Sequence, residues 1–308
     1  PPLLRSSAAS DVYKRQSNTF LNKIQPFVQL ARYDKPIGFM LLFWPCIWSL
    51  LLYSLHVGEL VPISFFILFF IGSIIMRGAG CTWNDFLDKD YDKSVKRTKD
   101  RPLASSKIKI TTAIFFLIIQ LFVGLLILIQ FNKLTIIFGC LSLIPVFIYP
   151  LMKRITWWPQ VFLGITFNWG ALLGWMSVSN NFSSVYPLFL YIACIFWTIG
   201  YDTIYAHQDK DDDLLLNLKS SAIKLGENTK YAMLIFYSIF FIIFAVILLN
   251  LSNSLIIHIA ILSLLVHLVS QIIYLDIDNS ERCLKIFKSN NLLGIQISFF
   301  LILEVLIN

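Results

Sequence analysis

The chain has 308 residues, of which 57% are hydrophobic and 14% charged, and its mean hydropathy is +0.72. These values lie outside the range of soluble globular domains and indicate a membrane protein that crosses the bilayer several times. The net charge of +7 is not gathered into a basic patch on a soluble surface, so no nucleic-acid binding is expected. The five cysteines form no Cys-x-x-Cys pair, which argues against a disulfide framework or a cysteine metal site.

Residues 1–16 lack an initiator Met and differ in composition from the rest, so we interpret them as a cloning or sequence-assembly remnant. Residues 17–308 form one membrane domain. In chain order it contains nine apolar runs of a length that crosses a bilayer as α-helix. The predicted fold class is therefore all-α, a polytopic membrane bundle of about nine transmembrane helices. The runs cover residues 38–55, 61–80, 109–131, 134–150, 158–178, 185–204, 231–250, 254–274 and 291–307.

Lys and Arg residues are concentrated in alternate links between these runs. The links after the second, fourth, sixth and eighth runs carry nearly all of them, whereas the other links carry only Lys133. By the positive-inside rule, the basic links and the N-terminal side face the cytoplasm or the mitochondrial matrix. Two aspartate-rich stretches lie in or beside these basic links, so we expect both at the same membrane face.

The first aspartate-rich stretch covers residues 84–92 and follows the second apolar run. If the preceding helix continues, Asp85, Asp88 and Asp92 lie within about 60° of one another on one helical face. In the second stretch, residues 201–213, Asp202 and Asp209 share a face with Asp213 by the same arithmetic. Carboxylates that share a face repel one another unless cations lie among them. Hard oxygen ligands of this kind suit Mg²⁺ that is bound through a substrate phosphate.

A simpler interpretation of each stretch is a solvated helix end. The repetition of the same i, i+7 spacing in two basic surroundings favours a shared binding site instead. Two such stretches at one membrane face are able to hold a diphosphate between them.

The motifs around these stretches, in their order along the chain, resemble those of the UbiA superfamily of intramembrane prenyltransferases. The resemblance covers about residues 28 to 226, and the last three runs match in hydropathy alone. It is carried by Arg32-Tyr33-Asp34-Lys35-Pro36, Asn84-Asp85-x-x-Asp88-x-x-x-Asp92, Arg97-Thr98-x-x-Arg101-Pro102, Tyr149-Pro150-x-x-Lys153-Arg154, Phe167-Asn168-Trp169-Gly170 and Tyr201-Asp202-Thr203. Within the superfamily, the pattern is most similar to the members that prenylate 4-hydroxybenzoate for ubiquinone synthesis.

The resemblance implies a helical bundle around a central cavity that opens to the basic side and laterally to lipid. It also implies two substrates, a polyprenyl diphosphate and 4-hydroxybenzoate, with Mg²⁺ as cofactor. Diphosphate leaves the allylic carbon, and the electron-rich ring attacks the cation-like fragment. The residues that match the metal and diphosphate positions are Asn84, Asp85, Asp88, Asp92, Asp209 and Asp213.

Basic side chains of the links are candidates for substrate contacts. Arg97, Arg101 and Lys153 are candidates to contact the diphosphate. Arg32 is intermediate between a substrate contact and a loop charge. We assign Arg154 to the carboxylate of the acceptor, because a guanidinium binds a carboxylate through two parallel hydrogen bonds and Lys does not. The alternative for each is a loop charge that only sets topology.

Further site candidates lie within the runs. Asp202 is a candidate to hold or deprotonate the acceptor phenol, or else to complete the metal shell. Tyr149 and Phe167 are placed to stabilise a cationic intermediate, although most aromatic residues here must serve packing. Asn168, a polar residue in mid-span, either lines the cavity or hydrogen-bonds a neighbouring helix.

Two alternatives stay open. One is a related prenyltransferase whose acceptor is homogentisate, a naphthoate or haem. The other is a cation-coupled transporter, although transporter ion sites usually lie at mid-membrane and these acids lie at a boundary. The host membrane is a bacterial plasma membrane or a mitochondrial inner membrane. Prenyl chain length and oligomeric state are left undetermined.

Overall fold

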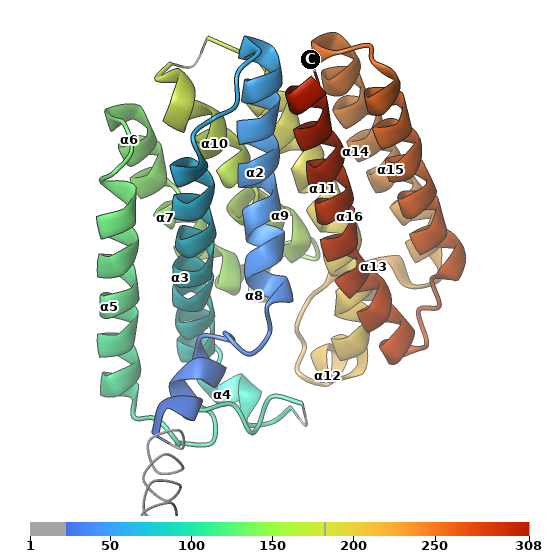
Figure 1. Cartoon of the computed structure of the whole chain (residues 1–308). Coiled ribbons are helices and arrows are strands. Elements are labelled where there is room, and N and C mark those ends of the chain that lie inside the picture. The colour runs from blue at the N-terminus through green and yellow to red at the C-terminus, as the bar shows by residue number, and fades with distance from the viewer. Residues whose placement is uncertain (1–22, 96, 182, 308) are drawn as a thin grey trace, which may run out of the picture.

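A computed structural model describes residues 23–95, 97–181 and 183–307. Residues 1–16, predicted to be a remnant, lie outside the described residues. Within these ranges the chain forms nine helical segments that are long and apolar enough to cross a membrane, as predicted. They are packed side by side with alternating direction (Figure 1). The segments are Ile37–Val57, Ile63–Leu87, Ile110–Leu128, Lys133–Ile155, Pro159–Ser179, Tyr186–Leu215, Ser221–Leu251, Leu255–Tyr274 and Ser280–Ile307.

Five of these segments are single helices. They are α2 (Ile37–Val57), α3 (Ile63–Leu87), α5 (Ile110–Leu128), α15 (Leu255–Tyr274) and α16 (Ser280–Ile307). A short helix, α4 (Lys89–Asp92), follows α3, and the seventh segment consists of α13 (Ser221–Leu225), η3 (Gly226–Asn228) and α14 (Thr229–Leu251). α16 begins eleven residues before the predicted run 291–307, because its first turns are polar and extend beyond the apolar stretch.

The fourth, fifth and sixth segments are interrupted. The fourth is divided into α6 (Lys133–Leu141), α7 (Leu143–Ile148), η1 (Tyr149–Leu151) and α8 (Met152–Ile155). The fifth consists of α9 (Pro159–Phe167) and α10 (Gly170–Ser179), and the sixth of α11 (Tyr186–Ala206), η2 (His207–Asp209) and α12 (Lys210–Leu215). Non-helical backbone inside a membrane protein is tolerated where it is buried in protein or lines a cavity. The interrupted fourth to sixth segments all contribute to the cavity wall.

The main hydrophobic core lies between α2, α11 and α14. Trp48, Trp197, Phe240 and Phe244 form its centre, with ring centroids 5.0 to 6.4 Å apart. Close approach of α10 to α2 depends on Gly174, because a Cβ added there would lie 2.7 Å from the carbonyl oxygen of Cys46. Small residues at such contacts are the usual means by which membrane helices pack closely.

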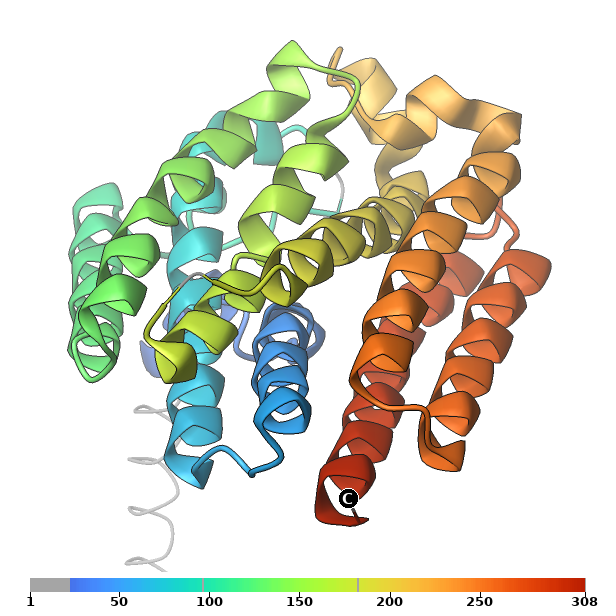
Figure 2. The same cartoon turned by 90° about the horizontal axis from the view of Figure 1, so that it is seen from above.

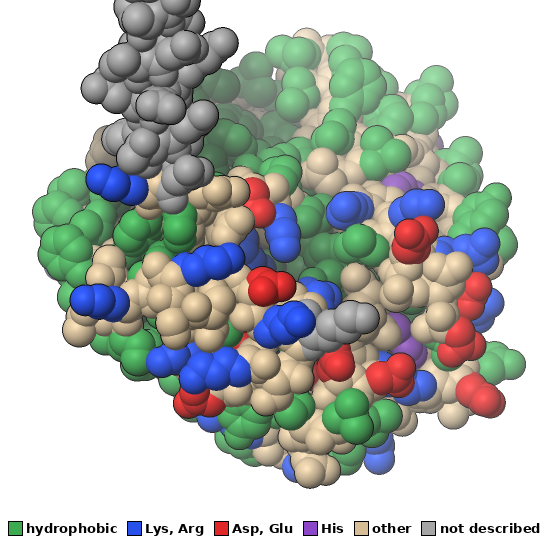
Figure 3. Space-filling model, turned by 90° about the horizontal axis from the view of Figure 1, so that it is seen from below, with side chains coloured by type: hydrophobic (Ala, Val, Ile, Leu, Met, Phe, Trp, Pro, Cys, Tyr) green, Lys and Arg blue, Asp and Glu red, His purple; other side chains and the backbone are tan. Residues whose placement is uncertain are grey.

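The helices are arranged in two flanking groups around a central one. Figure 2 shows α5 with α6–α8 at one edge and α14–α16 at the other, with α2 and α9–α11 between them. Both aspartate-rich stretches lie at the same end of the bundle, beside α4 and α12 (Figure 1). Lys and Arg side chains gather on this face together with Asp and Glu side chains (Figure 3). The predicted placement of both acidic stretches on the basic face is therefore confirmed.

Candidate functional site

One large cavity of about 1590 Å³ opens among the aspartates and continues into the apolar part of the bundle. Its walls come from α2, α3, α5, the interrupted fourth and fifth segments, α11 and the first turns of α16. All of the site residues predicted from the sequence line it except Asn168. The cavity is polar at its mouth and apolar further in, so it is suited to a molecule with an anionic head and a hydrocarbon tail.

The first aspartate-rich stretch is not the continuous helix that the spacing predicted. α3 ends at Leu87, Asp88 takes a non-helical conformation (φ −96°, ψ 5°), and α4 begins at Lys89. The prediction that three carboxylates share one helical face is therefore wrong in its geometry. Asn84 and Asp88 are nevertheless close, since the Nδ2 of Asn84 donates to the Oδ2 of Asp88 over 3.3 Å.

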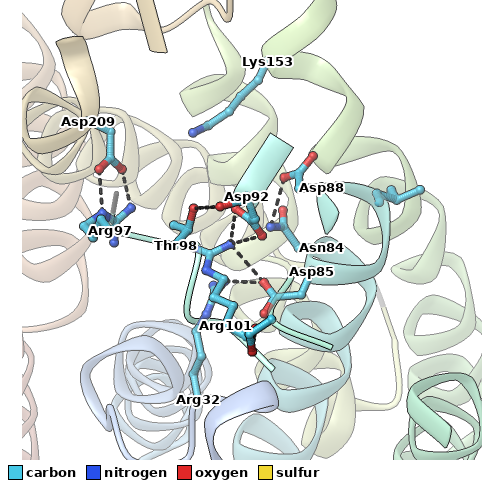
Figure 4. Close-up of polar contacts among 12 residues, drawn as sticks. Arg32, Asn84, Asp85, Asp88, Asp92, Arg97, Thr98, Arg101, Lys153 and Asp209 are labelled. Carbon is cyan, nitrogen blue, oxygen red and sulfur yellow. Dashed lines mark hydrogen bonds and ion pairs between the residues drawn. The ribbon is translucent and has the colours of Figure 1, made fainter. Parts of the chain in front are cut away.

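Asp85 is the centre of an ion-pair network (Figure 4). Its Oδ1 accepts from Arg32 at 2.6 Å and from Arg101 at 3.1 Å, and the residue is only 1% exposed. Arg101 also donates to both carboxylate oxygens of Asp92, at 2.8 and 3.0 Å. The side chain of Thr98 donates to the backbone oxygen of Asp92 and thereby fixes the loop that carries Arg101. The predicted Arg32 and Arg101 thus contact the first motif directly.

These ion pairs set the charge state of the first motif. Burial disfavours the charged form of Arg32, but the neighbouring acidic groups, with Asp85 foremost, together outweigh burial, so the pKa of Arg32 is raised above its usual range. Burial raises the pKa of Asp92, and the guanidinium of Arg101 opposes that shift. Arg101 therefore helps to keep the Asp92 carboxylate ionised.

The second aspartate-rich stretch is held by Arg97 and Lys153. Arg97 binds Asp209 through two parallel hydrogen bonds of 2.7 and 2.6 Å and also donates to the hydroxyl of Tyr205. The Nζ of Lys153 lies 3.9 Å from the Oδ1 of Asp213. Figure 4 shows Lys153 reaching from α8 toward the space between Asp209 and Asp92. Because Arg97 and Arg101 belong to one loop, that loop connects the two motifs across the cavity mouth.

The fit of a divalent cation can be judged from the donor set. No group of three or more His, Cys, Asp or Glu side chains converges on one point in the ranges that the structure describes. An all-protein metal cage is therefore absent there. Mg²⁺ is, however, commonly held by one or two carboxylates together with substrate phosphates and water. Asp213 fits this mode, because its Oδ2 is buried without a hydrogen-bond partner among the described residues and the residue lines the cavity.

The chain matches the UbiA prenyltransferase family over residues 42–299. The chain belongs to this family. It is 44% identical to the mitochondrial 4-hydroxybenzoate polyprenyltransferase of Drosophila melanogaster, over 98% of this chain and 77% of that protein. It is also 44% identical to the protein of the same name from Homo sapiens, over 88% of this chain and 73% of that one.

Solved structures show the same fold. A UbiA homolog from Aeropyrum pernix K1 superimposes with a TM-score of 0.72 at 21% identity, over 86% of this chain and 97% of that one. A UbiA homolog from Archaeoglobus fulgidus bound to GPP and Mg²⁺ has a TM-score of 0.63 at 16% identity, over 90% and 99%. The prediction of an all-α membrane bundle of the UbiA type is therefore confirmed.

In this UbiA family member, Arg154 lies at the rim of the cavity. It donates to the backbone oxygen of Leu87 at 3.1 Å and to the Oδ1 of Asp88 at 3.0 Å. Its guanidinium lies 4.7 Å from the centroid of the Tyr91 ring. The predicted Arg154 is thus joined to the first aspartate motif and remains partly exposed to the cavity.

Arg77, for which no role was predicted, lies in the cavity wall. Its guanidinium lies 5.0 Å from the centroid of Phe167, and its Nε is buried without a hydrogen-bond partner among the described residues. A charged residue within an apolar run was itself an indication of function, because such residues are costly inside a membrane. The predicted Tyr149 and Asp202 line the same part of the cavity.

The prediction that Asn168 contacts a substrate does not fit its position. Asn168 is fully buried, and its Nδ2 donates to the backbone oxygens of Gly164 and Cys194 and to the hydroxyl of Thr198. It lies between α9 and α10, at the interruption of the fifth segment. The side chain of Asn168 therefore links the interruption of the fifth segment to α11 by hydrogen bonds. Of the two alternatives left open by the sequence, this is the hydrogen bond to a neighbouring helix.

Proposed function

We propose that this UbiA family member transfers a polyprenyl group from polyprenyl diphosphate to the ring of 4-hydroxybenzoate and releases diphosphate, as a step of ubiquinone biosynthesis. The relatives named 4-hydroxybenzoate polyprenyltransferase support this activity. The observation that carries it is the joining of both aspartate motifs, by one Arg-bearing loop, at the mouth of a single apolar cavity. The family match favours this reaction over the transport alternative.

At the mouth, cationic side chains receive the diphosphate. Arg97, Arg101 and Lys153 border the same space and supply positive charge where negative charge grows on the leaving group. Mg²⁺ would be held by Asn84, Asp88, Asp92, Asp209 and Asp213, and when bound it neutralises further charge on the diphosphate. Asp85 has a different role in this proposal, because its Oδ1 accepts from two guanidinium groups, those of Arg32 and Arg101, whereas Asp92 and Asp209 each pair with one. It orients these two guanidinium groups.

The acceptor occupies the region between the mouth and the apolar chamber. Arg154 and Arg77 are both able to bind its carboxylate, Arg154 at the rim and Arg77 further in beside Phe167. Asp202 faces the same cavity from α11 and is the residue that we assign to accept the phenol proton. Phe167 and Tyr149 present aromatic faces that stabilise a cationic fragment and exclude water.

The protein is an integral membrane protein, since nine segments are long and apolar enough to span a bilayer in the part of the chain that the structure describes. We assign it to the mitochondrial inner membrane on the basis of the relatives, which are named mitochondrial. The basic face, and with it the cavity mouth, then faces the matrix by the positive-inside rule. In a bacterial host the corresponding side is the cytoplasm.

The function is tested with purified protein in lipid nanodiscs. The protein is incubated with 4-hydroxybenzoate, polyprenyl diphosphate and Mg²⁺, and the prenylated acid and free diphosphate are quantified. Equal amounts of both products are expected. Homogentisate, a naphthoate and a phenol without a carboxylate serve as competing acceptors. Faster transfer to any of them than to 4-hydroxybenzoate contradicts the proposed acceptor.

A further inference from the structure

Arg32 adopts a backbone conformation that is unusual for a residue with a side chain. After the helical residues 23–30, the backbone N–H of Arg32 donates to the oxygen of Gln29, and that of Tyr33 donates to the oxygen of Val28. These two hydrogen bonds form a Schellman motif, and Arg32 occupies its left-handed position with a φ of 55°. Glycine is the usual residue there, because a Cβ is strained at positive φ. Such strain persists only where surrounding contacts hold it in place.

The turn at Arg32 directs two neighbouring side chains to different places. Arg32 lines the cavity and donates to the Oδ1 of Asp85 at 2.6 Å (Figure 4). The hydroxyl of Tyr33 lies against α3 and α5 instead, where it accepts from the Nε2 of Gln120 at 3.2 Å. Leu30 and Ala31, which precede the turn, are fully buried. The same turn therefore presents a cation to the first aspartate motif and a phenol to the helix pair beside it.

Gln120 is a polar residue in the middle of α5. Three residues of α5 are buried, and Gln120, at 3% exposed, is the polar one among them. Thr82 of α3 shares its hydroxyl proton between the Oε1 of Gln120, at 3.1 Å, and the backbone oxygen of Gly78, at 3.0 Å. Both ends of the Gln120 amide are thus hydrogen-bonded, one to α3 and the other to Tyr33. Polar side chains are costly inside a membrane, so a role beyond packing is indicated.

Gly78 provides the space in which these groups meet. A Cβ added at Gly78 would lie 2.5 Å from the hydroxyl of Tyr33 and 2.6 Å from the Nε2 of Gln120. One of the two groups would have to move, so a side chain at this position would disturb the hydrogen bond between them. Gly78 is therefore needed for the contact between Tyr33 and α5.

We propose that Tyr33 and Gln120 are positioning residues for prenyl transfer. Their hydrogen bond holds the left-handed turn that places the guanidinium of Arg32 on Asp85, at the end of the cavity that receives the diphosphate. Neither residue touches the substrate in this proposal, since both act through Arg32. The proposal rests on the proposed function.

The proposal is tested by double-mutant cycles with the protein in lipid nanodiscs. Donor affinity is measured by titration calorimetry with farnesyl thiodiphosphate, in which sulfur replaces the bridging oxygen and slows departure of the leaving group. Tyr33→Phe and Gln120→Leu should each weaken binding about fivefold, the equivalent of one neutral hydrogen bond. In the Arg32→Ala protein, the same substitutions should change binding by less than about twofold. Effects that multiply in the doubly substituted proteins, or unchanged binding in either single variant, would overturn the proposal.

Steady-state transfer from farnesyl diphosphate to 4-hydroxybenzoate separates positioning from a general loosening of the cavity. Tyr33→Phe and Gln120→Leu should raise KM for the donor and leave KM for 4-hydroxybenzoate unchanged. Gly78→Ala removes no hydrogen-bonding group and should reproduce the donor effect, because its Cβ displaces Tyr33 or Gln120. An equal rise in KM for both substrates, or an unchanged donor KM in Gly78→Ala, would contradict the proposal.

Tyr237→Phe is the matched control for loss of a buried tyrosine hydroxyl. Tyr237 of α14 is 2% exposed, and its hydroxyl donates to the Oε1 of Gln271 of α15 at 2.7 Å. Its substitution should lower Tm without a change in donor binding. If Tyr237→Phe weakens donor binding as much as Tyr33→Phe, the effect follows from stability alone and the proposal is wrong.

The backbone at Arg32 is tested by comparing Arg32→Gly with Arg32→Ala. Both substitutions remove the guanidinium, so both should weaken donor binding to the same extent. Glycine accepts a positive φ, so the Tm of Arg32→Gly should be about 2 °C above that of Arg32→Ala. An equal or lower Tm for Arg32→Gly would contradict the strained turn. Absence of both donor binding and prenyl transfer in the wild-type protein would instead contradict the proposed function.

Discussion

Replacement of Asp85 by Asn tests whether this residue orients cationic side chains or binds metal directly. Asp85 is 1% exposed, and a single oxygen accepts from both Arg32 and Arg101. Asn retains the shape of Asp but removes the charge that balances the two guanidinium groups. The loop that carries Arg101 should then be held less firmly against the first motif.

The size of the effect follows from the ion pairs. Removal of one partner of a buried ion pair typically costs about 3–5 kcal/mol. The cost should be smaller here, about 2 kcal/mol, because the Arg32 and Arg101 side chains are 23% and 21% exposed and Arg101 keeps Asp92 as a partner. For a chain of this size that corresponds to a decrease in Tm of about 3 °C. Misplacement of the guanidinium groups should also lower kcat/KM for the diphosphate donor about tenfold.

The assay combines thermal unfolding in detergent with prenyl transfer at varied Mg²⁺ concentration. Asp85→Asn should lower Tm and kcat/KM while the Mg²⁺ concentration for half-maximal rate stays unchanged, whereas Asp88→Asn should raise that concentration. Asp90→Asn is the control from the same stretch, because Asp90 is exposed and pairs only with Lys93 among the described residues. An Asp85→Asn protein that behaves like Asp90→Asn, or that requires more Mg²⁺ like Asp88→Asn, would refute the orienting role.

Three further predictions concern other contacts of the site. Arg97→Lys removes the paired hydrogen bonds to Asp209, so KM for the diphosphate donor should rise about tenfold in steady-state assays. Arg77→Lys and Arg154→Lys should each raise KM for 4-hydroxybenzoate but leave the rate with a carboxylate-free phenol unchanged. If a substitution slows transfer to both acceptors equally, the replaced arginine does not bind the carboxylate. Asn168→Ala removes buried hydrogen bonds and should lower thermal stability by about 1–3 kcal/mol with unchanged KM values; a change in KM alone would contradict its structural role.

Much of the bundle could be predicted from the sequence because apolar runs and basic links report directly on burial in lipid. The nine runs and the common membrane face of the two acidic stretches follow from this pattern of hydropathy and charge. The interruption at Asp88 could not be predicted, since residues 84–92 contain no Gly or Pro that breaks a helix. The break follows from tertiary contacts, in which Arg101 and Arg154 bind Asp92 and Asp88 from other segments.

Individual site residues were less predictable than the motifs. Asn168 was a polar outlier in an apolar run, but the sequence does not show whether its side-chain amide hydrogen-bonds a neighbouring helix or faces a cavity. The same limit applied to Arg77, whose position in the second run indicated function without naming a partner. Such choices depend on which way a helix face points, and this is fixed only by packing against segments that are distant in the sequence.

The central claim is that both aspartate motifs act on one diphosphate at a single cavity mouth. It is tested most directly by measuring release of diphosphate and formation of prenylated 4-hydroxybenzoate by the purified protein and by its Asp88→Ala, Asp209→Ala and doubly substituted forms. The account predicts equal amounts of the two products from the wild-type protein, loss of both in each single variant, and little further loss in the double variant. Near wild-type transfer by either single variant, or independent effects that multiply in the double variant, would contradict it.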